Sequence, residues 1–330
     1  MKNFEFIFRV ANTEKDGAGH FFRCLAIAQH LENKNKLLVL DRNSDFFLKS
    51  LKNSRINFNS YKYCVDKKIV CKVCILDGYN FKTKEKAYWR KNSKYLIVID
   101  DVLREHNYAD LIVNIGLPKK IKSINNIKVL SGLEYSFVGK KILQRAKSYT
   151  LRKNVKNILI NLGFKDSKNI TLKILKFLTK IINKITEIHL FIVIGSDTIA
   201  LKKIKNFLKN FNIRNDLLVD VENIEDYLNR ADFVIGSGGV GLLERVAIGI
   251  PSITVLSAQN QFNQIQLLEK RGTSLFFEKE QINTQEFEKK FLELFNSYNL
   301  RNRIHKNCKK SFKINGCKNL LEKIQKFINE

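Results

Sequence analysis

The stretch FEFIFRV, from Phe4 to Val10, followed by Gly17-Ala18-Gly19-His20 and the helical run from Phe21 to Leu31, decides the fold of this chain. An apolar strand that feeds a helix through a glycine turn is typical of the first unit of a parallel α/β sheet. A second segment repeats the pattern: the strand from Asp232 to Ile235 leads into Gly236-Ser237-Gly238-Gly239, which opens another helix. Each glycine turn predicts a place where backbone N–H groups and a helix dipole face an anion.

Short apolar strands alternate with amphipathic helical stretches along the chain, and a basic, weakly patterned segment before residue 157 separates two such series. We therefore expect α/β architecture with two open parallel sheets, a boundary near residue 150, and ligands at the carboxyl ends of the strands. The expected parts are residues 1–150, residues 151–280 and a helical tail, residues 281–330, one helix of which could pack back on the first domain. The expected strands are 4–10, 37–40, 69–76, 95–99, 111–114, 127–130, 157–162, 189–194, 217–221, 232–235 and 252–256.

The composition fits a folded globular chain, and the formal net charge of +27 is its most unusual property. Such a charge alone would suggest nucleic acid or an anionic surface as a partner. The lysines are spread along the whole length, however, with the locally basic part between Lys289 and Glu330. We interpret that tail as a solvated helix face, so no nucleic-acid partner is expected, and contact of the tail with a membrane surface is the less favoured alternative.

The sequence contains no run of eighteen apolar residues and no secretion signal at its start, so we expect a cytoplasmic protein without a transmembrane segment. Its six cysteines lack the spacing of a disulfide framework, which predicts free thiols. Cys71 and Cys74 lie within one strand, and we assign them to the core rather than to a redox or zinc site.

The two glycine turns carry the first candidate site residues. Gly17 and Gly19 would let an anion approach the helix start, where His20 lies in the first turn as a candidate proton acceptor. The alternative is a tight turn with an ordinary surface histidine. Gly238 and Gly239 would admit a pyrophosphate, and Glu244, one turn into the helix, could accept hydrogen bonds from ribose hydroxyls, unless it simply pairs with a lysine.

Further candidates follow other strands. Asn260 and Gln261 begin a helix and offer the donors and acceptors that suit sugar hydroxyls and N-acetyl groups, or they serve as caps. Tyr79 and Asp101 are candidate cleft residues, whereas Asp100 is expected to fix its loop. With no His or Cys nearby to complete a ligand set, we predict no metal site.

These motifs together resemble a known family. Arg9, then Gly17-Ala18-Gly19-His20-x-x-Arg23-Cys24-Leu25-Ala26-x-Ala28, and later Gly238-Gly239-x-Gly241-x-x-Glu244-Arg245-x-x-x-Gly249-x-Pro251 with Asn260-Gln261, are similar to the nucleotide-sugar hydrolases of pseudaminic acid biosynthesis (the PseG family) and their spore-coat relatives of the SpsG type. Asp77-x-Tyr79, Asp100-Asp101, Asn114, Gly132 to Tyr135, and Leu162-Gly163 with Asp166 fall in the family's order. The resemblance spans roughly residues 4–277.

The resemblance implies two Rossmann-like domains that face a cleft, the glycosyltransferase-B fold of the MurG-type enzymes. It implies hydrolysis of a UDP-linked 2,4-diacetamido-2,4,6-trideoxy hexose to UDP and free sugar, without cofactor or metal, in a pathway that serves flagellin glycosylation. His20 would be the general base and Tyr79 would line the sugar side as a catalytic residue. The UDP-binding residues would be Gly17, Gly19, Gly238, Gly239 and Glu244, and the sugar-binding residues Arg9, Asp101, Asn260 and Gln261.

Two residues depart from the family pattern. Ala11 stands where the family usually has an acid, and Asp16 where it tends to have an apolar residue. Both flank the loop of His20, so the expected reaction is better founded than the expected sugar. A glycosyltransferase of the same fold is the runner-up, and a nucleic-acid-binding module, which rests on charge alone, is the third hypothesis.

Overall fold

The computed structural model describes residues 3–13, 17–32, 34–41, 45–102, 104, 106–117, 121–185, 187–312 and 315–330. The chain forms two compact units, one made of Met1–Lys140 with Asn315–Glu330, the other of Lys141–Ile314. The sequence-based division placed the boundary near residue 150 and assigned all of 281–330 to a tail. In the structure, two of the three tail helices lie in the second unit and the last in the first.

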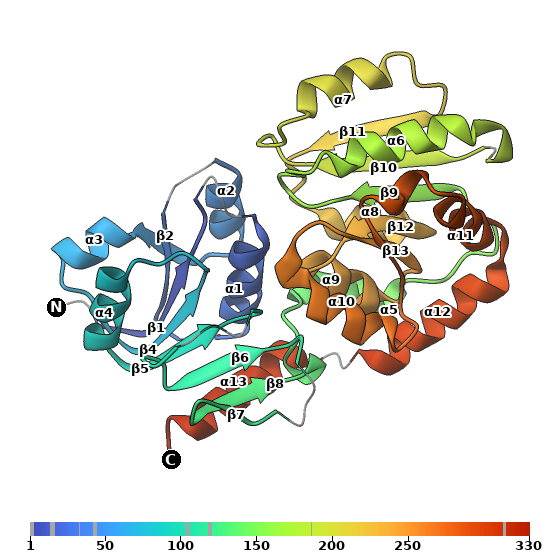
Figure 1. Ribbon diagram of the computed structural model, residues 1–330. Helices are drawn as coiled ribbons and strands as arrows, with labels where there is room; N and C mark the ends of the chain where they lie inside the picture. The colour runs from blue at the N-terminus through green and yellow to red at the C-terminus, as the bar shows by residue number, and fades with distance from the viewer. Residues whose placement is uncertain are drawn as a thin grey trace. The chain divides into compact units, whose positions relative to one another are not determined.

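The first unit is built on an eight-stranded sheet in the order β3-β2-β1-β4-β5-β6-β8-β7, in which only the pairing of β7 with β8 is antiparallel. Helices α1 and α2 cover one face, and α3 and α4 the other (Figure 1). The elements are β1 (Asn3–Val10), α1 (Gly19–Gln29), β2 (Lys36–Leu40), α2 (Asp45–Asn53), β3 (Asn57–Ser60), α3 (Tyr61–Asp66), β4 (Val70–Asp77), α4 (Thr83–Asn92), β5 (Ser93–Ile99), β6 (Leu111–Asn114), β7 (Ser123–Ile124) and β8 (Ile127–Ser131).

The core of this unit explains why its strands are almost continuously apolar. Both faces of a doubly wound parallel sheet are covered by helices, so alternate residues of each strand are buried on opposite sides. Trp89 of α4 and Cys64 of α3 pack on one face against Ile7, Cys71 and other strand residues. Both Cys71 and Cys74 are buried and free, which confirms their assignment to the core.

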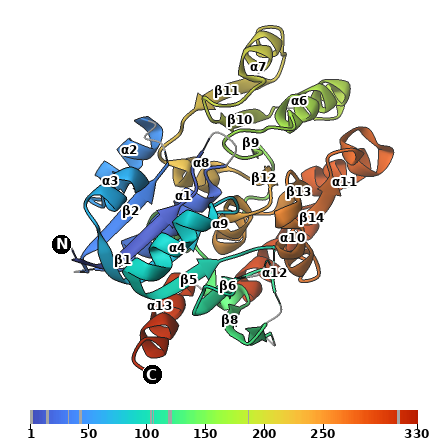
Figure 2. The same ribbon diagram turned by 60° about the vertical axis from the view of Figure 1, so that its left-hand side comes forward.

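The last helix, α13 (Gly316–Phe327), completes the first unit although it is far from it in sequence. Figures 1 and 2 show it, at the red end of the colour bar, beside this sheet. Tyr95 Oη donates to the carbonyl of Ile328 over 2.9 Å, and Asn319 Nδ2 donates to the carbonyl of Glu134 over 3.1 Å. The Cα of Gly316 packs directly on the backbone of Ser136, leaving no room for a side chain.

The second unit has a six-stranded sheet, entirely parallel, in the order β11-β10-β9-β12-β13-β14. Two parallel α/β sheets were expected from the sequence, and this is confirmed. The elements are α5 (Lys140–Ser148), β9 (Asn157–Asn161), α6 (Ile170–Lys180), β10 (His189–Ile194), α7 (Leu201–Leu208), β11 (Arg214–Val219), α8 (Ile224–Arg230), β12 (Phe233–Ser237), α9 (Val240–Ile248), β13 (Ser252–Leu256), α10 (Phe262–Glu269), β14 (Leu275–Glu278), α11 (Gln285–Asn296) and α12 (Tyr298–Ser311).

All six cysteines are buried with free thiols, as expected. In the part of the chain that the structure describes, no helix is both long and apolar enough to cross a membrane.

Candidate active site

Register places the candidate residues of the first unit at one edge of its sheet. Val10, the last residue of β1, is paired with Asp77, the last residue of β4, and Asp77 is paired with Ile99 at the end of β5. The loops that follow these strands therefore start side by side, and α1 begins at the same edge. His20, Tyr79 and Asp101 are brought together in this way.

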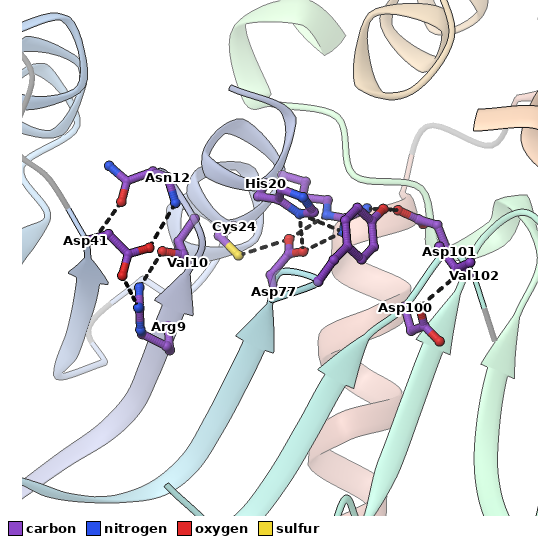
Figure 3. Close-up of polar contacts among 12 residues, drawn as sticks. Arg9, Val10, Asn12, His20, Cys24, Asp41, Asp77, Asp100, Asp101 and Val102 are labelled. Carbon is purple, nitrogen blue, oxygen red and sulfur yellow. Dashed lines mark hydrogen bonds and ion pairs between the residues drawn. The ribbon is translucent and has the colours of Figure 1, made fainter. Parts of the chain in front are cut away.

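His20 is held by a buried carboxylate. Its Nδ1 lies 2.7 Å from Oδ1 of Asp77, a residue with no exposed surface, while the histidine itself is 8% exposed (Figure 3). Arg23, one turn further along α1, donates to both carboxylate oxygens of Asp77 through Nε and Nη2. Its Nη1 donates to Oδ2 of Asp101 over 2.6 Å. The result is a buried cluster of one cation, two carboxylates and one imidazole.

The charge of Asp77 determines the tautomer of His20. Burial alone would raise the pKa of Asp77, but the charges of Arg23 and His20 and their hydrogen bonds outweigh burial and lower that pKa to about 2. An ionised carboxylate only accepts hydrogen bonds, so its 2.7 Å contact favours the neutral His20 tautomer with the proton on Nδ1, whereas Nη2 of Arg23, a donor 3.0 Å from the same nitrogen, opposes it. Nε2 then carries the lone pair, and it has no hydrogen-bond partner among the residues that the structure describes. This is the arrangement of an oriented general base.

Tyr79 packs against His20 and is anchored by Asp101. Its ring stands edge-on to the His20 ring at 4.7 Å between centroids, and its hydroxyl donates to Oδ2 of Asp101 over 2.7 Å. Burial, followed by the charge of Asp101, raises the pKa of the Tyr79 hydroxyl. The guanidinium of Arg104 lies 4.9 Å above the Tyr79 ring and donates to the Tyr79 carbonyl. Tyr79 is thus a protonated donor with a fixed ring, and it is no base.

Asp100 has the structural role expected for it. Its carboxylate accepts hydrogen bonds from the backbone N–H groups of Val102 and Arg104 over 2.9 and 2.7 Å, and from Nε2 of His106 over 3.0 Å. Burial raises its pKa, but these hydrogen bonds dominate and lower it overall. Asp100 therefore fixes the loop that carries Asp101 and Arg104.

Arg9 does not have the role that was expected of it. It is 1% exposed, and its guanidinium is paired with Glu85 and Asp41 in a second cluster, separate from His20 in Figure 3. The ring of Phe81 lies 4.7 Å from it. With its donors committed and its surface covered, Arg9 ties β1 to neighbouring elements, and we withdraw it as a sugar-binding residue.

The N-terminus of α1 has two features that an anion-binding site requires. No side chain caps the helix, and its first turn holds no acidic residue. A Cβ on Gly17 or Gly19 would meet no atom within 4 Å among the described residues, so packing within the chain does not require glycine there. Asp16, which departs from the family pattern, lies outside the described residues.

In the second unit, the glycine loop meets the residues expected to bind the sugar. Gly239 adopts φ 72° and ψ −146°, a conformation open essentially to glycine alone. A Cβ on Gly238 would lie 2.9 Å from Cβ of Gln261, and the Gly239 N–H donates to Oε1 of Gln264 over 2.8 Å. Gln261 Oε1 in turn accepts from the hydroxyl of Ser257 over 3.0 Å. Gln261, next to Asn260 in sequence, is therefore packed against the candidate phosphate loop.

Glu244 lies one turn into α9, the helix that this loop opens, and is half-buried. Burial raises the pKa of its carboxyl to about 7, with the charge of Arg245 opposing this and that of Glu225 adding to it. The structure shows no ion pair to Glu244 from any described lysine, so the alternative of a lysine partner is not seen.

Sequence reasoning gave no role to three residues of these sites. Arg23 lies three residues after His20, a spacing that puts both on one helix face and could have indicated their contact. Gln264 lies three residues after Gln261, so the same spacing could have indicated that the two side chains share a helix face. Arg245 was quoted only as part of a motif.

Comparisons with known proteins agree with this architecture. Residues 157–320 match the glycosyltransferase family 28 C-terminal domain. MurG from Acinetobacter baumannii has a similar structure, with a TM-score of 0.65 at 14% identity over 98% of this chain and 99% of that one. The S. aureus MnaA–UDP co-structure gives a TM-score of 0.66 at 12% identity, over 100% and 97% of the two chains. The chain therefore has two Rossmann-like domains of the glycosyltransferase-B fold.

In sequence, the chain is 23% identical over 172 residues to the spore coat polysaccharide biosynthesis protein SpsG of Bacillus subtilis, covering 51% of this chain and 50% of that protein. The chain spans about half the length of the curated relatives it matches.

Proposed function

We propose that this protein hydrolyses a UDP-linked 2,4-diacetamido-2,4,6-trideoxy hexose to UDP and the free sugar, a step of nonulosonic (pseudaminic) acid biosynthesis. The observation that carries the proposal is the buried Asp77–His20 pair, which holds Nδ1 of the imidazole as a donor and leaves Nε2 as a base. A phosphate-binding glycine turn alone would suit any nucleotide-binding protein.

In the proposed reaction, a water oxygen forms a bond to the anomeric carbon while the bond from that carbon to the diphosphate oxygen breaks. His20 Nε2 takes the proton of the water, and the charge of the resulting imidazolium is stabilised by Asp77. The leaving UDP gains negative charge, which the backbone N–H groups at the start of α9 would stabilise. The proposal assigns both tasks to protein groups and needs no cofactor.

The remaining contacts are proposed from the two units separately. In the first, Tyr79 and Asp101 would contact the sugar, with Gly17 and Gly19 admitting it or its phosphate. In the second, Gly238, Gly239 and Glu244 would bind UDP, and Asn260 and Gln261 would contact the acetamido groups, since a carboxamide both donates and accepts.

The comparisons support a UDP-sugar substrate without selecting the reaction. MnaA has been solved with UDP, and the name of the B. subtilis relative places that protein in polysaccharide biosynthesis. The link to pseudaminic acid, and through it to flagellin glycosylation, rests on the ordered motifs of the sequence.

A glycosyltransferase is the second candidate, and the observation that raises it is the match to the glycosyltransferase family 28 C-terminal domain. The same base would then deprotonate an acceptor hydroxyl instead of water. The His20 geometry serves both reactions equally.

The test is to incubate the purified protein with the UDP-linked diacetamido sugar and no acceptor, and to follow UDP and free sugar by NMR. We expect both products to appear together, and to be lost in His20→Asn. His30→Asn is the matched control, because His30 lies at the other end of the same helix, where its Nδ1 contacts the Ala26 carbonyl at 2.9 Å. Turnover only with an added acceptor would establish the transferase instead.

A further inference from the structure

The second unit buries a cation that has no carboxylate partner. Arg245 is 2% exposed, yet its only hydrogen bonds to described residues are from Nη2, to the carbonyl of Ser237 over 2.7 Å and to Oγ1 of Thr254 over 3.3 Å. Its Nε has no hydrogen-bond partner there, and no described carboxylate forms an ion pair with it. An uncompensated buried charge is costly, so it is uncommon unless a ligand completes it.

The guanidinium lies beneath the glycine loop. A Cβ placed on Gly236 would lie 2.5 Å from Nη1 of Arg245, and one placed on Gly241 would lie 3.4 Å from the same atom. Gly236 belongs to the carboxyl end of β12 and Gly241 to the first turn of α9, so Nη1 lies between the strand end and the helix start. The same loop also lacks side chains at Gly238 and Gly239.

The other groups around the Arg245 guanidinium, at the N-terminus of α9, favour the binding of an anion. The N-cap residue of α9, Gly239, has no side chain of its own, and the first turn of the helix holds no acidic residue, although the Gly239 N–H already donates to Oε1 of Gln264. Glu244 is the neighbouring carboxyl, and burial raises its pKa to about 7, which weakens it as a counter-charge. Burial also lowers the pKa of Arg245 to about 10, still well above neutral pH, so the guanidinium stays charged.

We propose that Arg245 is a positioning residue of the diphosphate site: it holds a permanent positive charge beneath the loop 236–241, and this charge binds the anion together with the backbone N–H groups of the loop and of α9. The inference rests on the proposed function, which supplies a nucleoside diphosphate as the ligand. Arg245 acts through the loop and need not touch the phosphates.

Isothermal titration with UDP and with uridine tests this proposal, because only UDP carries the charge that Arg245 attracts. In Arg245→Met, we expect UDP affinity to fall by about tenfold to a hundredfold while uridine affinity stays within about threefold. Arg245→Gln, whose amide can still donate to the Ser237 carbonyl, is the second uncharged variant in case the first fails to fold. Arg245→Lys should restore part of the UDP affinity.

Arg301→Met is the matched control. Arg301 is likewise buried, at 1% exposed, with an unpartnered Nε, but its guanidinium donates to the carbonyls of Leu294, Phe295 and Lys153, none of them in the glycine loop. Its replacement should destabilise the fold and leave the ratio of UDP to uridine affinity unchanged. An unchanged ratio in a folded, uncharged Arg245 variant would overturn the proposal.

Inorganic pyrophosphate separates this inference from the proposed function. Pyrophosphate binding that depends on Arg245, in a protein that releases no UDP from its proposed substrate, would overturn the function and support the site. Acceptor-free hydrolysis by the wild type, together with an unchanged ratio of UDP affinity to uridine affinity in the Arg245 variants, would support the proposed function and overturn the role of Arg245. A wild-type protein that binds neither UDP nor pyrophosphate would overturn both.

Discussion

Replacing Asp77 with Asn should remove the base while keeping the shape of its cluster. The new side chain has one acceptor oxygen, which Arg23 takes because its Nε and Nη2 now both donate to the carboxylate. The amide NH₂ then faces Nδ1 of His20, which must accept instead of donate. The imidazole proton moves to Nε2, and the lone pair that would receive the proton of water is lost.

The expected magnitude has two parts. General-base catalysis typically contributes about 10²- to 10⁴-fold, so kcat should fall by that range while UDP affinity, which belongs to the other unit, stays unchanged. The variant should also lose on the order of 2 kcal/mol of unfolding free energy at neutral pH, because the pKa of Asp77 is lowered from 3.8 to about 2. A lowered carboxyl pKa stabilises the fold above the unfolded pKa, so the difference between the proteins should disappear as the pH falls from about 4 to 2.

The assay is acceptor-free UDP release, with chemical denaturation between pH 2 and 7 in parallel. Asp232→Asn is the control for stability alone. Asp232 has no exposed surface and accepts hydrogen bonds from the backbone N–H groups of Lys156 and Asn157 over 2.7 Å. It directly precedes β12, so it lies at the amino end of that strand, away from the glycine loop at the carboxyl end. If Asp77→Asn keeps kcat within about tenfold of wild type while His20→Asn abolishes it, the tautomer argument is refuted.

Four further substitutions test the site. Tyr79→Phe should reduce kcat by less than about tenfold, because the raised pKa makes its hydroxyl a donor to Asp101 and not a base; a 10³-fold loss in steady-state assays would contradict this. A carboxyl with a raised pKa stabilises the fold below its unfolded pKa, and this stabilisation is lost as the carboxyl ionises. For Glu244, the unfolding free energy should therefore decline as the pH rises from about 4.5 to 7, and this decline should be absent in Glu244→Gln. Chemical denaturation at both pH values measures the difference. Gly239→Ala should lose about 1–3 kcal/mol of unfolding free energy from its backbone conformation, whereas Gly19→Ala, with open space for its Cβ, should unfold like wild type; equal thermal shifts in the two would count against the assigned strain.

The strands were predictable where their sequence is a continuous apolar run. Every expected strand is present, and Leu111–Asn114, His189–Ile194 and Ser252–Leu256 have the expected bounds. The sequence analysis missed β3, β7 and β14. β3 has the sequence Asn-Phe-Asn-Ser and lies at the edge of its sheet, so it needs few apolar residues and resembles a loop.

Sheet topology allowed us to predict which residues lie near the site, but not which of them form pairs. Strand ends of a parallel sheet converge, which was enough to select Tyr79 and Asp101. Which acid pairs with His20 depends on the register of β1 with β4, and a one-residue shift would have turned Asp77 to the other face. The pairing of Arg9 was missed for the same reason: its partners are Asp41, directly after β2, and Glu85 of α4, both distant in sequence, and nothing near Arg9 indicates them.

The two units differ in how they compensate buried arginines, and this difference accords with the separate tasks proposed for them. In the first unit, Arg9 is paired with Asp41 and Glu85, and Arg23 with Asp77 and Asp101, so each buried cation meets two carboxylates. Such pairing gives rigidity and a fixed carboxylate for His20, and it leaves neither of these two guanidinium groups unpaired. In the second unit, the carbonyls at the end of α11 stabilise Arg301, as expected at a helix C-terminus. Arg245 is in the last turn of α9, but its guanidinium extends back to Gly241 in the first turn, where the helix dipole disfavours a cation. A cation retained against the helix dipole, beneath a loop that lacks side chains at Gly236, Gly238, Gly239 and Gly241, is best explained by an anion that binds on the other side of that loop.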